Sequence, residues 1–456
     1  MQRRSKPVGD KLFDLNFVLL VVLLLILALA GGASRADVLG QTVARSSAWL
    51  IAIIAILFAP KPPFRAIAPV TALFFTAAGL VILQLIPLPP IVWGSLPGRE
   101  ILIQAAIAAN EPQPWRPISL SPGATINALS SLIVPAVALF LSAGMREKQW
   151  WWLMNVLLSL IALSCLLAAL QFAGSRFDNP LINDVPGDVS GIFANRNHFA
   201  LLLACGCAVA PAWAFSSSRS PDWKALASIG LITLFMLTIL VTGSRMGILL
   251  GAAGITLGVA SVWQRILKRA KAVPRHLLIP VLLTIAGLLV ISVIMFIAMD
   301  RAASISRALN IDTSTDLRRA ALPTVLQMVK AYAPFGAGFG TFDPAYRIHE
   351  PASLLSYRYF NHAHNDWLEL LVGGGIPAAL LLAIALGWTA VASIRAWRIP
   401  AESGTLLPRT GSSLLFLVAL ASATDYPART PLIMVVLIFA AVWLSSLGAA
   451  RAQATI

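Results

Sequence analysis

Charged residues are scarce in this sequence. They make up 12% of its 456 positions, while a soluble domain has roughly 25%. Hydrophobic residues make up 58%, and apolar runs of about twenty residues recur along the whole chain. Each run is long enough to cross a hydrocarbon core of roughly 30 Å. Because backbone amides in lipid must be paired within their own segment, we expect these runs to be helices.

Several signatures of soluble enzymes are also missing. The chain has no Asp-x-Asp motif, no Walker-type phosphate loop, no Gly-x-Ser-x-Gly and no His-Glu-x-x-His. The three cysteines, Cys165, Cys205 and Cys207, all fall inside predicted helices. We interpret them as small core residues rather than a disulfide or metal set. We therefore expect neither a bound metal nor a cofactor.

The apolar runs predict an all-α, polytopic membrane protein with about twelve transmembrane helices. The predicted spans are 15–32, 43–59, 67–86, 124–144, 150–172, 197–215, 224–242, 245–263, 277–299, 366–391, 411–425 and 431–447. The net charge of +15 follows this topology, because most basic residues of the short connections lie on one side. By the positive-inside rule that side is cytoplasmic, as are both termini. This distribution indicates the inner membrane and its lipids, and it excludes a nucleic-acid partner.

The N-terminus allows two interpretations. Basic residues followed by an apolar stretch and small residues resemble a cleavable signal peptide. We favour an uncleaved first helix, because many further spans follow. No internal repeat or low-complexity linker divides the chain, so we treat residues 1–456 as a single membrane domain.

Polar residues gather in three segments on the predicted periplasmic face. The first, 87–123, is rich in proline, and we expect it to form an irregular cap. The second is 173–196, and the third is a long periplasmic loop, 300–365. Four of the five histidines lie on this face: His198, His349, His362 and His364. We therefore expect the chemistry there.

A helix is predicted within the long loop. Over residues 317–333, Leu322, Val325 and Val329 repeat at helical spacing and form an apolar stripe. Arg318 falls in the middle of that stripe, whereas Arg319 lies about a quarter turn away. Arg318 therefore points at the protein or the membrane surface. It either meets an anionic partner there or extends its charged end into water.

Arg245 is unfavourably placed by local rules. Ser244 is a good N-cap for the next span, so Arg245 lies in the first helical turn. The positive end of the helix dipole disfavours a cation there by a few tenths to about 1 kcal/mol. A bound phosphate would reverse this balance. The alternative is an interfacial anchor for the helix.

The segment 361–369, Asn-His-Ala-His-Asn-Asp-Trp-Leu-Glu, leads into another span. Asn365 can cap that helix, and Glu369 suits its first turn. Capping leaves His362 and His364 unexplained. A histidine near neutral pKa beside carboxylates is well suited to act as a general base. The alternative is a metal site, for which His-x-His-x-Asp is a weak signature.

A third polar group stands at the mouth of the span that begins near residue 197. Its side chains are amides, a cation and an imidazole, which suit sugar hydroxyls and phosphate oxygens. The same residue types would also cap a helix. The group consists of Asn195, Arg196, Asn197 and His198.

Four motifs together resemble the O-antigen ligase and polysaccharide polymerase superfamily of bacterial membrane proteins. They are Gly191-Ile-Phe-Ala-Asn-Arg-Asn-His-Phe-Ala200; Gly243-Ser-Arg245; Asp316-Leu-Arg318 with Pro334-Phe-Gly-Ala-Gly-Phe-Gly340; and His364-Asn-Asp-Trp-Leu-Glu369 with Gly373-Gly-Gly-Ile-Pro377. Each motif is loose, but their order and spacing are specific. The resemblance covers a core of about 190–378.

This resemblance implies a metal-independent glycosyltransferase. Its donor would be a glycan linked to undecaprenyl pyrophosphate, and its acceptor a hydroxyl of another glycan, of lipid A core or of another molecule. His364 matches the loop histidine proposed as the base, with His362 as an alternative. Arg245 and Arg318 match the arginines that hold the pyrophosphate, with Arg319 as the neighbouring alternative.

Ligase and polymerase differ in the acceptor, and the sequence does not separate them. The competing classes are a membrane transporter and a non-catalytic subunit of a polysaccharide export complex. A transporter would need charged or broken helices near the bilayer midplane, and few such features are present.

Overall fold

The computed structural model describes residues 13–174, 179–183, 187–216, 222–270, 313–355, 360–400 and 403–454, with single positions between 283 and 298. Three parts of the sequence prediction lie outside the described residues. They are the basic N-terminus, most of the span predicted at 277–299, and the beginning of the long loop.

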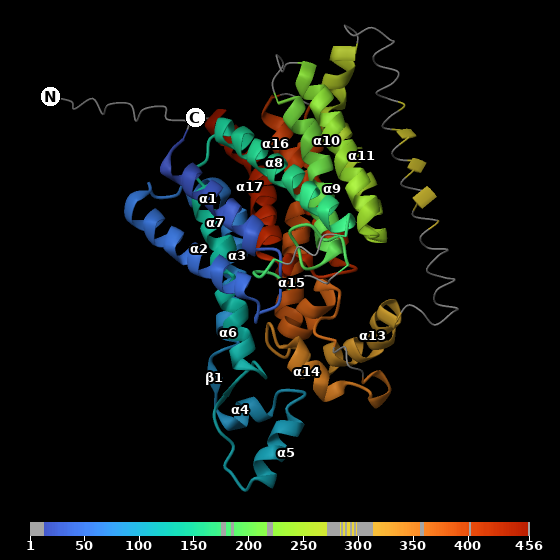
Figure 1. The fold of residues 1–456 in the computed structure, drawn as a ribbon. Coiled ribbons are helices and arrows are strands. Elements are labelled where there is room, and N and C mark those ends of the chain that lie inside the picture. The colour runs from blue at the N-terminus through green and yellow to red at the C-terminus, as the bar shows by residue number, and fades with distance from the viewer. Residues whose placement is uncertain are drawn as a thin grey trace, which may run out of the picture.

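The described chain is mainly helical (Figure 1). The longer helices are α1 (Leu15–Ala30), α2 (Leu39–Phe58), α3 (Ala68–Leu83), α6 (Pro122–Ser131), α7 (Ile133–Ser142), α8 (Glu147–Phe172), α9 (Arg196–Ala214), α10 (Asp222–Thr242), α11 (Arg245–Ala270), α13 (Thr313–Ala331), α15 (Asp366–Arg398), α16 (Leu406–Ser422) and α17 (Pro431–Ala454). The shorter elements are η1 (Phe64–Ile67), α4 (Pro90–Gly94), α5 (Glu100–Ala108), α14 (Phe342–His349), η2 (Ala352–Leu354), η3 (Ser403–Thr405), η4 (Pro427–Arg429), β1 (Pro87–Leu88) and β2 (Arg116–Pro117).

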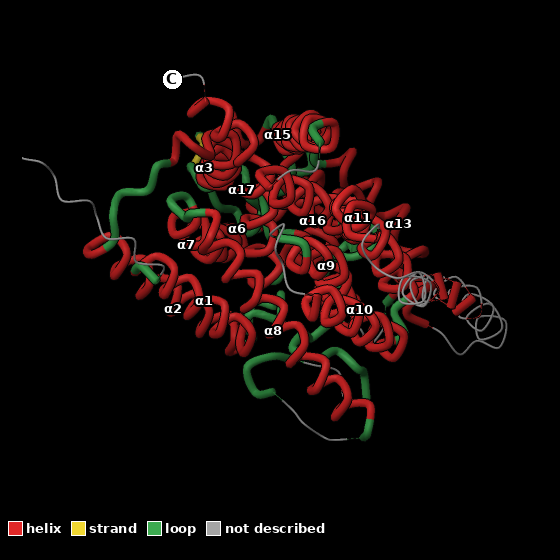
Figure 2. Tube along the Cα trace, turned by 90° about the horizontal axis from the view of Figure 1, so that it is seen from above, coloured by secondary structure: helices red, strands yellow, loops and turns green. Residues whose placement is uncertain are grey.

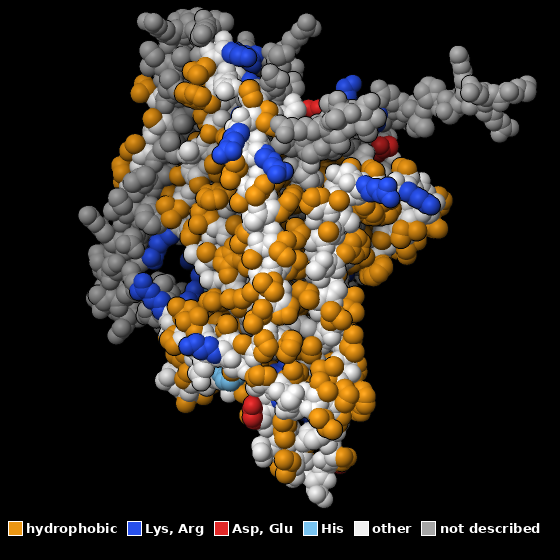
Figure 3. All heavy atoms as spheres, turned by 180° about the vertical axis from the view of Figure 1, so that it is seen from behind, with side chains coloured by type: hydrophobic (Ala, Val, Ile, Leu, Met, Phe, Trp, Pro, Cys, Tyr) orange, Lys and Arg blue, Asp and Glu red, His pale blue; other side chains and the backbone are white. Residues whose placement is uncertain are grey.

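Within the described residues, eight helical segments are long and apolar enough to cross a membrane. Three further apolar helices are shorter: α1, α16 and the part of α17 up to Ser446. The helical, polytopic character of the chain is thus confirmed, while the number of spans stays a prediction. Hydrophobic side chains cover most of the middle of the face in Figure 3, as a lipid-facing surface requires.

Helix α9 lies at the centre of the bundle, where it packs against α8, α10, α11 and α16 (Figure 2). Small residues allow this close packing: a Cβ on Gly254 of α11 would lie 2.4 Å from the carbonyl oxygen of Ala204. The three cysteines are free and buried here and in α8, as predicted for core residues. A helix buried on all sides holds its own N-terminus firmly in place.

One end of the bundle carries the segments predicted to be periplasmic (Figure 1). The segment 87–123 is more regular than the irregular cap we expected, since it forms α4, α5 and the antiparallel β1–β2 pair. The buried guanidinium of Arg99 stabilises it by donating to the carbonyls of Ile118 and Gly336. This arginine therefore joins the cap to the glycine-rich loop at 334–340.

Helix α15 is interrupted where that loop docks. Gly375 has φ 57° and ψ −146°, which breaks the helix and leaves backbone groups for other partners. The amides of Ala337 and Gly338 donate to the carbonyls of Val372 and Gly373, and the amide of Ile376 donates to Pro334. The two glycine motifs of the sequence thus form one joint, which fixes α13 relative to the beginning of α15.

Candidate active site

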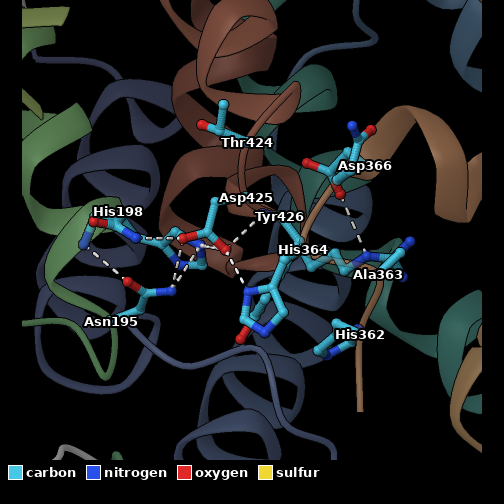
Figure 4. A network of polar contacts seen from close by, with 12 residues as sticks. Asn195, His198, His362, Ala363, His364, Asp366, Thr424, Asp425 and Tyr426 are labelled. Carbon is cyan, nitrogen blue, oxygen red and sulfur yellow. Dashed lines mark hydrogen bonds and ion pairs between the residues drawn. The ribbon is translucent and has the colours of Figure 1, made fainter. Parts of the chain in front are cut away.

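Asp425 is the centre of the polar network in Figure 4. It lies in the turn between α16 and α17, and its side chain is 4% exposed. The amide nitrogens of Asn195 and Asn197 donate to its Oδ2 at 3.1 and 2.7 Å. On the other side, Nδ1 of His364 lies 3.3 Å from its Oδ1. Asp425 thus joins two motifs that are far apart in sequence.

The beginnings of α9 and α11 are locked together beside Asp425. Asn195 caps α9 by accepting from the amide of Asn197 at 2.8 Å. Ser244 caps α11 in the same way, accepting from Gly247 at 3.0 Å, and its hydroxyl donates to Oδ1 of Asn197 at 2.8 Å. The cap predicted at Ser244 is confirmed, and Asn195 has the capping role that was the alternative to sugar binding. Since Asn197 also donates to Asp425, the Gly-Ser-Arg turn belongs to the same network.

His364 stands at the end of the long loop, just before α15. Its φ is 48°, a left-handed conformation that is uncommon for a residue with a side chain. Asn365 fixes this turn on both sides, because it accepts from the amide of Leu368 and donates to the carbonyl of Ala423. Asn365 is therefore a capping and tethering residue, as its predicted capping role requires. Strained backbone of this kind concentrates at functional sites.

Burial and neighbouring charges set the ionisation of the pair. Burial lowers the pKa of His364, the hydrogen bond to Asp425 raises it in part, and the charge of Arg318 lowers it again. Burial alone would raise the pKa of Asp425, but the imidazoles of His198 and His364 and the charge of Arg318 hold it well below its usual range. The pair is therefore a carboxylate beside a neutral imidazole at neutral pH.

The charge of Arg318 reaches this pair from α13. Arg318 is half-buried and Arg319 is exposed, as the predicted orientation requires. The predicted apolar stripe was wrong in one position, because Leu322 is 42% exposed. Val325 is buried as predicted, Val329 is half-buried, and Ala321 and Met328 complete the buried face. Pro323 lies inside the helix, and the buried face keeps Arg318 turned toward His364 and Asp425.

A second carboxylate–histidine pair lies beside the first. Nδ1 of His362 is 3.0 Å from Oε1 of Glu369, which also accepts from the Ala363 amide through Oε2 at 3.1 Å. Arg429 completes this group, with a guanidinium nitrogen 3.2 Å from Oε1 of Glu369. The first-turn position of Glu369 was predicted, but its role as a shared partner of His362 and Arg429 was not.

Tyr426 separates the two pairs. Its ring centroid lies 4.3 Å from that of His362, 5.0 Å from that of His364 and 5.2 Å from that of His198. Burial raises the pKa of its hydroxyl, and the charge of Asp425 raises it further, so the phenol stays protonated. The ring therefore acts as a rigid spacer among three imidazoles.

The remaining predicted residues differ in their relation to this centre. Arg196 points to the surface, where it lies 3.5 Å from Asp188. His198 is buried and its Nε2 is 3.8 Å from Oδ1 of Asp425, so its imidazole lies against the carboxylate. Arg245 is half-buried in the first turn of α11, next to Ser244.

Sequence reasoning missed Asp425, Tyr426 and Arg429. The predicted span 411–425 placed Asp425 inside the membrane, but α16 ends at Ser422 and leaves the aspartate in a turn. Arg429 lies in the short connection before the last span, where an arginine carries no special signal. The one available signal was Pro427, two residues after Asp425, since proline is typical of the turn that follows a helix. Within the described residues, no group of three or more His, Cys, Asp and Glu side chains is arranged to hold a metal ion.

Comparison with known proteins gives one result that bears on this site. Residues 229–383 match the family model of O-antigen ligase. This region runs from α10 into α15 and includes Arg245, Arg318 and His364, while Asp425 lies beyond it. No curated protein matches the chain. The match supports the assignment of this membrane protein to the O-antigen ligase superfamily, with a ligase- or polymerase-type role in polysaccharide biosynthesis.

Proposed function

We propose that the protein is a glycosyltransferase of the periplasmic face of the inner membrane. It transfers glycan from an undecaprenyl-pyrophosphate carrier to a hydroxyl of an acceptor, which is a second carrier-linked glycan for a polymerase and a terminal acceptor such as lipid A core for a ligase. The observation that carries this proposal is the His364–Asp425 pair, placed within the electrostatic reach of Arg318.

In this reaction His364 is the base. Nδ1–H donates to Oδ1 of Asp425, which leaves Nε2 as the lone-pair nitrogen for the acceptor hydroxyl. Nε2 takes the proton as the acceptor oxygen attacks the anomeric carbon. The bond from that carbon to the pyrophosphate oxygen breaks, and the leaving group keeps the electron pair. Asp425 stabilises the imidazolium that forms.

The arginines stabilise the departing charge. Arg318 enters from α13, and Arg245 lies in the first turn of α11, where backbone amides also favour an anion. Fixed cations of this kind need no rearrangement when negative charge develops on the pyrophosphate. We therefore assign the pyrophosphate to Arg245 of α11 and Arg318 of α13, and the acceptor hydroxyl to Nε2 of His364.

The test is complementation of a deletion strain with His364→Ala, Arg245→Ala and Arg318→Ala, each checked for membrane level. Surface polysaccharide is measured on gels, and carrier-linked glycan by mass spectrometry. We expect loss of product and accumulation of carrier-linked glycan, whose length separates ligase from polymerase. The matched controls are Lys330→Ala and His349→Ala. Lys330 is an exposed cation on the same helix as Arg318, and the His349 imidazole is hydrogen-bonded to the Tyr332 hydroxyl.

Normal polysaccharide in all three variants would contradict the proposal. In that case a transporter or a non-catalytic subunit becomes the better account, since neither role needs a base at His364. Loss of product in the two control variants as well would indicate damage to the loop rather than to chemistry.

A further inference from the structure

A cavity of about 360 Å³ opens on the far side of His362 from the His364–Asp425 pair. Its volume lies at the lower end of the range for small-molecule sites, roughly 300–1,000 Å³. Its walls come from segments that are far apart in sequence: the 31–38 turn, α2, α6, α14, residues 361–362, α15, η4 and α17. Neither the proposed base nor the arginines of the pyrophosphate side belong to it.

Charge balance distinguishes this cavity from the pyrophosphate side. It is lined by three arginines and three carboxylates. Arg35 pairs with Asp37 at 3.0 Å, and Arg429 pairs with Glu369 at 3.2 Å. The third carboxylate, Asp343, accepts from Arg347 at 2.9 Å. A dianionic pyrophosphate would have to displace these acids, whereas a neutral ligand leaves every pair in place.

The remaining lining groups suit hydroxyls. Asn127 accepts from Arg45 at 2.6 Å, and Gln41 accepts from the same arginine at 3.1 Å, so a donor and two amides are held in fixed positions. Ser131, Asn361 and His362 add further polar atoms, and Phe342 adds an apolar surface. Oriented amides, a hydroxyl, an imidazole and one aromatic wall match a sugar ring, which has polar edges and apolar faces.

From these observations we propose that the cavity binds a neutral sugar ring of the glycan, one position removed from the reacting centre. The inference rests on the proposed transferase function and extends it. His362 and Tyr426 form the wall between the two sites, with ring centroids 4.3 Å apart. A glycan that reaches across this wall has one ring in the cavity and the next at His364. The ring comes either from the acceptor or from the donor.

The experiment uses the full-length protein in lipid nanodiscs and oligosaccharide released by mild acid from the parent strain's lipid-linked glycan. Binding is followed by saturation-transfer NMR. Ser131→Trp fills the cavity, and Asn127→Leu removes one amide without added bulk. Ile126→Trp adds the same ring at an exposed position of the same helix and is the matched control. Inorganic pyrophosphate is the competitor.

We expect Ser131→Trp and Asn127→Leu to weaken binding, the latter by about three- to tenfold, as for a lost hydrogen bond. Ile126→Trp should bind like the parent, and pyrophosphate should not displace the sugar. In a transfer assay, both cavity variants should have a higher KM for one of the two substrates and an unchanged kcat. A rise for the acceptor assigns the ring to the acceptor, and a rise for the donor assigns it to the donor.

Parent-like binding in both cavity variants, or displacement of the sugar by pyrophosphate, overturns the inference. The transferase proposal has a separate test, and it is contradicted if the His364→Ala strain makes normal polysaccharide. If His364→Ala abolishes transfer and the cavity variants change neither binding nor KM, the sugar site is wrong and the transferase proposal remains.

Discussion

Nδ1 of His364 lies 3.3 Å from Oδ1 of Asp425, and Asn195 and Asn197 donate to the other carboxylate oxygen of the same aspartate. The carboxylate therefore fixes which nitrogen of the imidazole carries the proton. Every further contact of Asp425 restricts its rotation. The imidazole of His364 is thus oriented by groups that belong to three different helix ends.

Asp425→Asn tests this orientation. The amide keeps the shape but cannot stabilise an imidazolium, and its NH2 group would face the donors of Asn195 and Asn197. We expect the transfer rate to fall by roughly 10²- to 10⁴-fold with KM values little changed. Single-turnover transfer in nanodiscs measures it. A rate within threefold of the parent would show that Asp425 has only a structural role.

The pH dependence of transfer follows from the lowered pKa of His364. Burial is the main cause, so the imidazole stays neutral down to a pH below its ordinary value of about 6.5. A reaction that needs neutral His364 loses rate as pH falls through that lowered pKa. In Asp425→Asn the negative charge that raises the pKa of His364 is gone, so the residual acid limb should shift to lower pH. A rate–pH profile from pH 4.5 to 8 checks both statements, and an acid limb above pH 6.5 in the parent would contradict them.

Arg318→Ala and Arg319→Ala should differ. Arg318 is half-buried and acts on His364 and Asp425, while Arg319 is exposed. Loss of a fixed group that stabilises developing charge costs roughly 10²- to 10³-fold in rate. We expect that loss in Arg318→Ala and less than a threefold change in Arg319→Ala. Equal loss in both variants would mean that the two arginines share the anion. The readout is the amount of carrier-linked glycan, measured by mass spectrometry.

The two histidines can be separated by chemical rescue. His364→Gly removes the imidazole and also relieves the left-handed backbone at φ 48°. Added imidazole should then restore part of the transfer rate, since it can occupy the vacated volume beside Asp425. His362→Gly should retain more activity and show no rescue, because its partner Glu369 keeps Arg429 and the Ala363 amide. Rescue in His362→Gly alone would move the base to His362.

Gly375→Ala tests the joint between α15 and the 334–340 loop. A Cβ there would lie 2.1 Å from the carbonyl oxygen of Pro334, at a φ that disfavours alanine. We expect a loss of stability of at least about 1 kcal/mol. Gly387→Ala, on the same helix with open space around it, should be neutral or slightly stabilising. Thermal unfolding in detergent compares the two, and equal midpoints would show that the joint can relax.

Local sequence rules were sufficient for much of this architecture. Hydropathy and helix caps located most helices, and Ser244 and Asn195 begin α11 and α9 as their types predict. The orientation of Arg318 also followed from helical periodicity. These features depend on residues within one or two turns of each other, which is the range over which a sequence pattern determines structure.

Those local rules could not predict contacts between segments that are distant in the sequence. Asp425 is followed by an ordinary turn, and its importance comes from Asn195, Asn197 and His364, which reach it only after the bundle assembles. Placing the end of the span three residues too late concealed the aspartate inside a predicted helix. Arg429 was hidden in the same way, because a loop arginine has no local feature that reveals a buried acid 60 residues earlier.

The route from Ser244 through Asn197 to Asp425 also bears on how this fold can be recombined. The matched region, 229–383, contains the proposed base and both arginines but not the aspartate or the asparagines that orient His364. In a chimera that exchanges only this stretch between two relatives, the histidine would come from one protein, and the aspartate and asparagines around it would come from the other. Compatible grafts must carry the start of α9 and the α16–α17 turn together with it, so the exchangeable unit is larger than the segment by which the family is recognised.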